Sequence, residues 1–153
     1  MKKIFKIIAL TLLAALLIIQ FIRPDKNESG YESIAYFENE TKPNDQIKAI
    51  LKSNCYDCHS NQTIYPWYAE IAPVSYWLAD HIEHGREHFN VSDWEQYSNK
   101  KKDHKLEELV EEVEEGEMPL NSYTWTHGSL NDQDKEVLIQ WAKDLRTKYS
   151  ASQ

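Results

Sequence analysis

The 153-residue sequence has few cysteines, few glycines and a minority of basic residues. Its two cysteines cannot form the disulfide framework of a small secreted scaffold. Its four glycines are fewer than strand-rich folds usually need for their turns, which favours helices. The 17 Lys and Arg against 25 Asp and Glu argue against nucleic-acid binding by phosphate neutralisation. This acidity either attracts basic protein partners or simply keeps the protein soluble.

Charge is also scarce near the amino terminus. The first six residues carry three lysines, and residues 7–22 are nearly all apolar, interrupted only by Thr11 and Gln20. This run is just long enough to span a bilayer, and residues 23–26 do not resemble a small-residue cleavage site. We therefore predict an uncleaved signal anchor over residues 1–23, a transmembrane helix that makes the membrane a partner. The positive-inside rule then places the rest in the periplasm of a two-membrane bacterium. A cleaved signal peptide is the alternative.

The remainder has the length of one domain. Residues 24–43 are polar without clear periodicity and predict a flexible tether. Helical periodicity predicts four helices, at about residues 45–58, 74–87, 104–115 and 132–149, and a short helix is expected after Ser92. These helices predict an all-α domain over residues 44–149, followed by a tail at 150–153. The expected apolar faces are Ile47, Ile50, Leu51 and Cys55; Val74, Trp77, Leu78, His81 and Ile82; Leu106, Leu109, Val110 and Val113; and Val137, Leu138, Trp141 and Leu145.

The most specific motif is C-x-x-C-H, formed by Cys55, Cys58 and His59. Two thiols one helical turn apart can add to the two vinyl groups of one porphyrin, and the next residue places an imidazole near the iron. A thioredoxin-like motif would begin a helix after a strand, whereas this motif ends a predicted helix. A structural zinc site would need a second pair of ligands. A simple disulfide is a further alternative. We predict one covalently attached haem c, with His59 as an axial ligand of the iron.

The second axial ligand is predicted from the loop before the last helix. Met118 is followed by Pro119, and a thioether held in such a loop can face the iron. His/Met ligation raises the reduction potential and suits electron transfer. His81, on the second helix, and His127, in the same loop as Met118, are the alternatives. The iron can also keep an open sixth position, with Met118 serving only as an apolar packing residue.

Other side chains are expected to support the haem. The imidazole N–H of His59 needs an acceptor, for which we expect a backbone carbonyl near Tyr65 and Pro66. Arg86 is expected to neutralise a haem propionate. Five aromatic side chains are candidates for the walls of the haem site, with ordinary core packing as the alternative for each: Trp67, Tyr68, Trp77, Trp94 and Trp141.

Two resemblances follow from these motifs. A helix leading into C-x-x-C-H, a Met-Pro loop and a final amphipathic helix resemble class I cytochrome c. More specifically, residues 55–78, CYDCHSNQTIYPWYAEIAPVSYWL, and residues 81–86, HIEHGR, resemble a bacterial haem-binding-domain family. This resemblance covers about residues 46–146 and implies a small exported cytochrome with a cytochrome c-like helical fold. Leu120 is a departure, because related Met-Pro loops often have a second proline there.

The favoured interpretation is a membrane-anchored protein that carries one electron between redox partners, which its acidity suggests are basic. The first alternative is a haem enzyme such as a peroxidase, which needs an open or displaceable sixth position and a distal acid–base group. The second is a haem-based sensor or accessory subunit. The sequence does not decide whether the protein is an enzyme, although no second catalytic motif is present. A single C-x-x-C-H excludes a multihaem chain.

Overall fold

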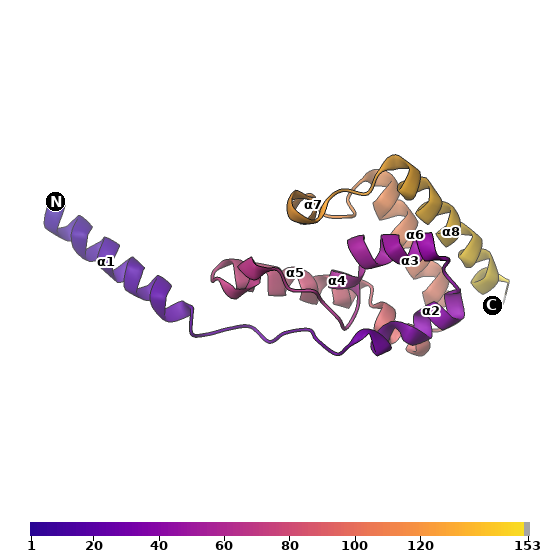
Figure 1. Cartoon of the computed structure of the whole chain (residues 1–153), viewed down its shortest axis with the longest axis horizontal. Coiled ribbons are helices and arrows are strands. Elements are labelled where there is room, and N and C mark those ends of the chain that lie inside the picture. The colour runs from indigo at the N-terminus through magenta and orange to yellow at the C-terminus, as the bar shows by residue number, and fades with distance from the viewer. Residues whose placement is uncertain (152–153) are drawn as a thin grey trace.

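The computed structural model describes residues 1–151, which form helices joined by short segments (Figure 1). The α-helices are α1 (Lys2–Ile19), α2 (Ala35–Thr41), α3 (Asp45–Asn54), α4 (Tyr56–His59), α5 (Val74–His88), α6 (Asn99–Glu115), α7 (Asn121–His127) and α8 (Asp132–Ser150). The 3-10 helices are η1 (Tyr31–Ile34), η2 (Trp67–Glu70) and η3 (Val91–Gln96). The described residues contain no strand beyond one isolated antiparallel bridge, so the prediction of an all-α fold is confirmed. Of the predicted tail, residues 152 and 153 lie outside the described part.

Helix α1 corrects the prediction of a transmembrane anchor. It ends at Ile19 and contains three lysines, so its uncharged part is residues 7–19. At about 1.5 Å per residue these residues span about 20 Å, less than the hydrocarbon core of about 30 Å. Within residues 1–151 no helix is long and apolar enough to cross a membrane. The predicted signal anchor is therefore wrong, and so is the membrane-anchored, periplasmic localisation that depends on it.

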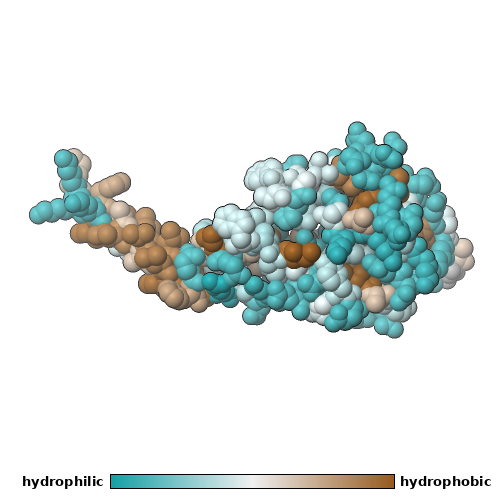
Figure 2. Space-filling model, viewed as in Figure 1, coloured by the Kyte–Doolittle hydropathy of each residue, from teal (hydrophilic) through white to brown (hydrophobic). Residues whose placement is uncertain are grey.

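Helix α1 projects from one end of the molecule, opposite the carboxyl terminus (Figure 1). Its surface is apolar, whereas the end of the body formed by α6 and α8 is mostly polar (Figure 2). The end of α1 is attached to the start of α5 through Gln20. The Gln20 side chain donates to the Ala72 carbonyl at 3.0 Å and accepts from the Ala72 amide at 2.9 Å. Arg23 and Lys26 both form ion pairs with Glu70 of η2, which holds the following segment in place.

The predicted tether over residues 24–43 is wrong for its second half. Residues 31–41 form η1 and α2, and Ile34 and Phe37 are only 2% and 1% exposed. Thr41, one turn further along α2, is also buried. These three residues follow the i, i+3, i+7 spacing of a helix face. The segment is therefore ordered because its apolar side chains complete the core.

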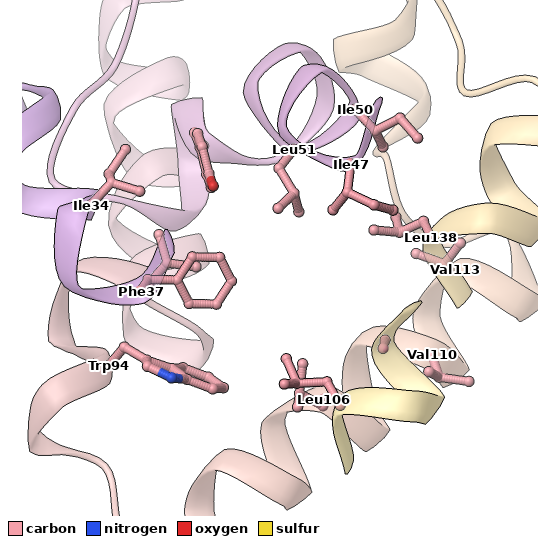
Figure 3. Packing of buried hydrophobic residues seen from close by; sticks show 14 of the residues in the cluster. Ile34, Phe37, Ile47, Ile50, Leu51, Trp94, Leu106, Val110, Val113 and Leu138 are labelled. Atoms are coloured by element: carbon pink, nitrogen blue, oxygen red, sulfur yellow. The ribbon is translucent and has the colours of Figure 1, made fainter. Parts of the chain in front are cut away.

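The core lies between α2, α3, η3, α6 and α8 (Figure 3). Trp94 of η3 is fully buried at its centre and packs edge-on against Phe37, with ring centroids 5.1 Å apart. Trp94 therefore belongs to the protein core, and the partly buried Trp141 packs against it, which is the alternative to a wall of the haem site. The predicted faces of three helices are confirmed as core, with these residues buried or packed against it: Ile47, Ile50, Leu51, Cys55, Leu106, Leu109, Val110, Val113, Val137, Leu138, Trp141 and Leu145.

Side-chain caps set where three helices begin. Asn44 accepts from the Ile47 amide at the start of α3, and Asn131 accepts from the Asp134 amide at the start of α8. Ser98 caps α6 in the same way, so this helix starts five residues before the predicted position 104. Gly116 ends α6 with a φ of 80°, which a residue without a side chain adopts at little cost.

A nearly buried ion pair connects three helices of the core. Lys102 of α6 is 5% exposed, and its Nζ lies 2.9 and 2.7 Å from the two carboxylate oxygens of Glu40 in α2. Tyr149 of α8 donates its hydroxyl to the same carboxylate at 2.8 Å. Burial alone would raise the pKa of Glu40, but the hydrogen bonds from Lys102 and Tyr149 outweigh it and lower this pKa.

Candidate functional site

The C-x-x-C-H motif lies at a break between two helices. The predicted single helix over residues 45–58 is interrupted at Cys55, whose φ and ψ are −126° and −48°. Helix α4 then begins, and the His59 amide donates to the Cys55 carbonyl at 2.9 Å. Cys55 and Cys58 are therefore one helical turn apart, as two thiols that add to one porphyrin need to be. Both are partly buried and are free cysteines, with no disulfide between them.

The redox and zinc alternatives find little support around the two thiols. Burial raises the pKa of the Cys55 thiol to about 12 and that of Cys58 to about 11. Both side chains are therefore neutral thiols near pH 7, whereas reactive disulfide-exchange cysteines are thiolates. Within residues 1–151, no three His, Cys, Asp or Glu side chains are grouped so as to hold a metal ion.

His59 is held in one orientation by backbone carbonyls of α5 and the residue that follows it. Its Nδ1 lies 3.0 Å from the Gly85 oxygen and 2.9 Å from the Phe89 oxygen. Because carbonyl oxygens only accept hydrogen bonds, Nδ1 carries the proton and the lone pair is on Nε2. Burial lowers the pKa of His59, which keeps the ring neutral and able to bind a metal through Nε2.

The acceptors of His59 differ from the expected carbonyl near Tyr65 and Pro66. The Tyr65 hydroxyl instead accepts a hydrogen bond from the Asn27 amide at 2.8 Å. The true acceptors lie 26 and 30 residues after His59 in the sequence. They are backbone atoms, so no local sequence signal identified them.

Gly85 allows α5 to approach the motif this closely. A Cβ atom on Gly85 would lie 2.7 Å from the Cys58 carbonyl oxygen and 3.0 Å from the Cys58 Cβ. The first distance is shorter than a non-bonded contact allows, and the backbone atoms on both sides cannot easily move. The same residue supplies one of the two acceptors of His59, so Gly85 is a site residue that the sequence analysis missed.

A hollow with a volume of about 40 Å³ opens to solvent beside Cys58. This volume is well below that of enclosed small-molecule and cofactor sites, so the hollow is shallow and open. Its walls come from α4, the segment before η2, α5 and the segment containing α7, and most of their exposed area is apolar. We call it the hollow, and it is lined by Asp57, Cys58, Thr63, Ile64, Pro66, Tyr68, Trp77, Leu78, His81, Ile82, Leu120, Ser122, Tyr123 and His127.

The apolar stripe of α5 faces this hollow. Ile82 is buried, but Val74 and Trp77 remain 37% and 45% exposed. Trp77, Leu78 and Ile82 all line the hollow. The stripe is thus an apolar surface that the protein itself covers only in part.

The candidates for the second axial position lie in different places. His81 and His127 both line the hollow. A backbone carbonyl fixes each ring through Nδ1. The Nδ1 of His81 lies 2.9 Å from the Trp77 carbonyl oxygen, and the Nδ1 of His127 lies 3.2 Å from the Tyr123 carbonyl oxygen. Met118 is partly buried against the core, two residues before Leu120 of the lining. Ligation by Met118 stays a prediction, and His81 and His127 stay its alternatives.

Among the described residues that line the hollow, three that were predicted to support the haem are missing: Tyr65, Trp67 and Arg86. Arg86 donates from Nε to the Asn61 side-chain oxygen at 3.1 Å. Trp67 is 77% exposed and packs edge-on against Tyr68, with ring centroids 5.8 Å apart. Contact of Arg86 with a propionate, and of Trp67 with the haem, remain predictions.

The donor set and its surroundings fit a covalently bound haem. Cys58 lines an apolar hollow, and Cys55 lies one helical turn before it. The hydrogen bonds of the His59 ring are made through Nδ1, which leaves Nε2 for a metal. A family profile described as a haem-binding domain matches residues 14–144. No curated protein and no solved structure matches the chain. The matched residues are most of the chain and include the motif, α5, Met118 and most of α8, so the chain belongs to the haem-binding-domain family.

Proposed function

We propose that the protein holds one haem c through thioether bonds at Cys55 and Cys58, with His59 as an axial iron ligand, and that it carries single electrons. The observation that carries this proposal is the pair of hydrogen bonds from His59 Nδ1 to the carbonyls of Gly85 and Phe89. They fix the ring tautomer and raise the basicity of Nε2, as a second shell does for a metal-bound histidine.

Covalent attachment needs no oxidant. Each thiol adds across one vinyl group, so that a carbon–sulfur bond forms and the thiol hydrogen ends on the neighbouring carbon. The bound haem supplies an iron that alternates between the ferric and ferrous states. The chain's part is to hold the two sulfurs and the His59 ring in place, and to cover the haem with the apolar residues of α5.

An electron carrier needs no proton-transfer group, and its iron can have both axial positions occupied by protein ligands. Met118 is the ligand we propose for the second axial position, since its thioether raises the reduction potential. The net charge of −8 favours a redox partner with a basic surface. Association with such a partner is expected to weaken as salt is added.

One observation favours a second candidate function. His81 and His127 both line the hollow, and either could act as the distal acid–base group of a peroxidase-like haem enzyme. This function, like that of a haem-based sensor, requires an open or displaceable sixth position. The identity of the sixth ligand therefore distinguishes these functions from electron transfer.

The first test is to express the full chain in a host with c-type haem maturation enzymes. We expect haem to remain attached on a denaturing gel, and the pyridine haemochrome spectrum to be that of two thioether bonds. Cys55→Ala and Cys58→Ala should each shift this spectrum to that of a single thioether bond or abolish attachment. A chain that binds haem only reversibly would contradict covalent attachment.

The sixth ligand is tested in the same material. Met118→Ala should remove the weak near-infrared band of a Met–iron(III) bond, while His81→Ala and His127→Ala should leave it unchanged. A wild-type spectrum that is high-spin, with rapid binding of cyanide, would contradict Met118 ligation and favour the enzyme or sensor.

A further inference from the structure

Helix α7 forms one wall of the hollow and is weakly attached to the rest of the protein. None of its residues is buried, and Trp125 is 81% exposed. It is only seven residues long, and Gly128 follows it with a φ of 82°. A helix this short, without a buried face, has little stability of its own. Its position must therefore come from specific side-chain contacts.

Tyr123 makes the main contact. Its hydroxyl lies 2.9 Å from the Ser53 carbonyl oxygen and 3.0 Å from Asp57 Oδ2. The hydroxyl proton is shared between these acceptors, of which the carboxylate is the stronger because it is charged. Burial, and next the charge of Asp57, raise the pKa of Tyr123, so the hydroxyl stays protonated and remains a donor.

Asp57 is a rigid anchor inside the haem-attachment motif. It lies between Cys55 and Cys58, and its other carboxylate oxygen accepts from the Ile64 amide at 2.8 Å. Its backbone carbonyl also accepts a hydrogen bond from the Thr63 hydroxyl. The side chain and the backbone carbonyl of Asp57 are thus both held by residues 63 and 64. The hydrogen bond from the Tyr123 hydroxyl therefore attaches α7 to the part of the chain that would bear the haem.

The same helix carries or adjoins two candidates for the sixth ligand. The His127 ring stacks on the Tyr123 ring, with centroids 4.1 Å apart and an interplanar angle of 8°. Met118 lies three residues before the start of α7. A second contact to α7 comes from Tyr68 of η2, whose hydroxyl lies 2.9 Å from Thr126 Oγ1. This second bond is exposed and joins two neutral groups, so it is the weaker of the two.

We propose that Tyr123 is a positioning residue that holds α7 against the haem-attachment motif through Asp57, and thereby keeps α7 in place as the wall on the sixth-ligand side of the hollow. The inference rests on the proposed haem site, but the attachment of α7 can be measured without haem. Tyr123→Phe keeps the ring and its stacking on His127 and removes only the hydroxyl. Tyr68→Phe is the matched control, because it removes the neutral hydroxyl bond to the same helix.

The first measurement is hydrogen exchange of the amides of residues 121–127 in the full chain without haem. We expect these amides to exchange about tenfold faster in Tyr123→Phe, as the loss of a hydrogen bond to a charged acceptor implies, and less than about threefold faster in Tyr68→Phe. Exchange in α6 and α8 should not change, since Tyr123 lies outside the core. Equal exchange in the two variants would overturn the proposal.

The second measurement is the rate of cyanide binding to the oxidised holoprotein. Opening of α7 should limit this rate, so we expect it to rise about tenfold in Tyr123→Phe. Faster exchange of α7 without faster cyanide binding would overturn the proposal, because Tyr123 would then not control access to the iron. If no covalent haem forms, the proposed function fails, while the exchange comparison still decides whether Tyr123 holds α7.

Discussion

The two halves of the helical body differ in what covers their aromatic side chains. In the half built from α2, α3, η3, α6 and α8, Trp94 and Phe37 are 0% and 1% exposed. Around the hollow, Trp67, Trp77 and Trp125 are 77%, 45% and 81% exposed. Large exposed apolar surface usually marks a place where something binds. The first half is closed by the protein alone, whereas the second leaves large aromatic rings exposed.

Helices α5 and α6 differ in the same way, although both have apolar residues at helical spacing. In α6, Leu106 and Val110 are 0% and 4% exposed, whereas in α5, Val74 and Trp77 are largely uncovered. Periodicity therefore predicts which face of a helix is apolar, but not whether protein or a ligand covers that face.

The largest expected effect separates the two halves in the chain without haem. Phe37→Ala should lower the free energy of unfolding by about 3–5 kcal/mol, because it leaves a cavity among Tyr56, Trp94 and Trp141. Trp67→Ala should change it by less than about 0.5 kcal/mol, since this ring is mostly in solvent. Urea unfolding followed by circular dichroism measures both. Similar losses in the two variants would show that the halves do not differ as proposed.

A second substitution tests how closely α5 must approach the haem motif. Gly85→Ala places a methyl group against the Cys58 carbonyl, and we expect a loss of about 2–3 kcal/mol in unfolding free energy. It should also reduce the yield of covalent haem, since the acceptors of His59 move with α5. Glu83→Ala, at an exposed position of the same helix, is the control and should be nearly neutral. Normal stability and haem content in Gly85→Ala would contradict this role of Gly85.

The smallest effect concerns pH and belongs to the core half. The folded-state pKa of Glu40 is lower than its unfolded value, so its contribution to stability is present above the ordinary pKa of about 4.5. This contribution is lost as the pH falls from that value through the lowered pKa. Glu40→Gln should cost about 1 kcal/mol at pH 7 and should flatten the fall in stability below about pH 4.5.

Unfolding curves at several pH values measure this effect. Glu111→Gln, at an exposed position of α6, is the matched control and should keep the acid dependence of the wild type. If the free energy of unfolding of Glu40→Gln fell below about pH 4.5 as steeply as that of the wild type, Glu40 would not be the cause of this pH dependence.

The sequence predicted the long helices α5 and α8 within one residue at each end, but it missed the short helices α2 and α7. Residues 132–149 match α8 closely, because caps and apolar spacing are local signals. Helix α7 was predicted as part of a loop, since Pro119 and Ser129 flank a segment with no apolar stripe. Its position depends on the hydroxyl of Tyr123 and on Asp57, 66 residues away, which no local pattern encodes.

The candidate site shows the same division. The C-x-x-C-H spacing alone identified Cys55, Cys58 and His59. The acceptors of His59 and the need for Gly85 were missed, because they arise from the packing of α5 on α4. The helical segment over residues 31–41 was missed because its two buried apolar residues, Ile34 and Phe37, are outnumbered by the polar residues around them.

The antiparallel bridge between residues 27–29 and 61–63 also gives the chain a mechanical connection. The Ser29 amide donates to the Asn61 carbonyl at 2.8 Å, and the Thr63 amide donates to the Asn27 carbonyl at 2.9 Å. Because such bonds run across the chain direction, tension applied through α1 loads them once the Gln20 contact and the ion pairs of Arg23 and Lys26 with Glu70 have yielded. Force from the amino-terminal helix therefore reaches the residues just after His59 before it reaches the core.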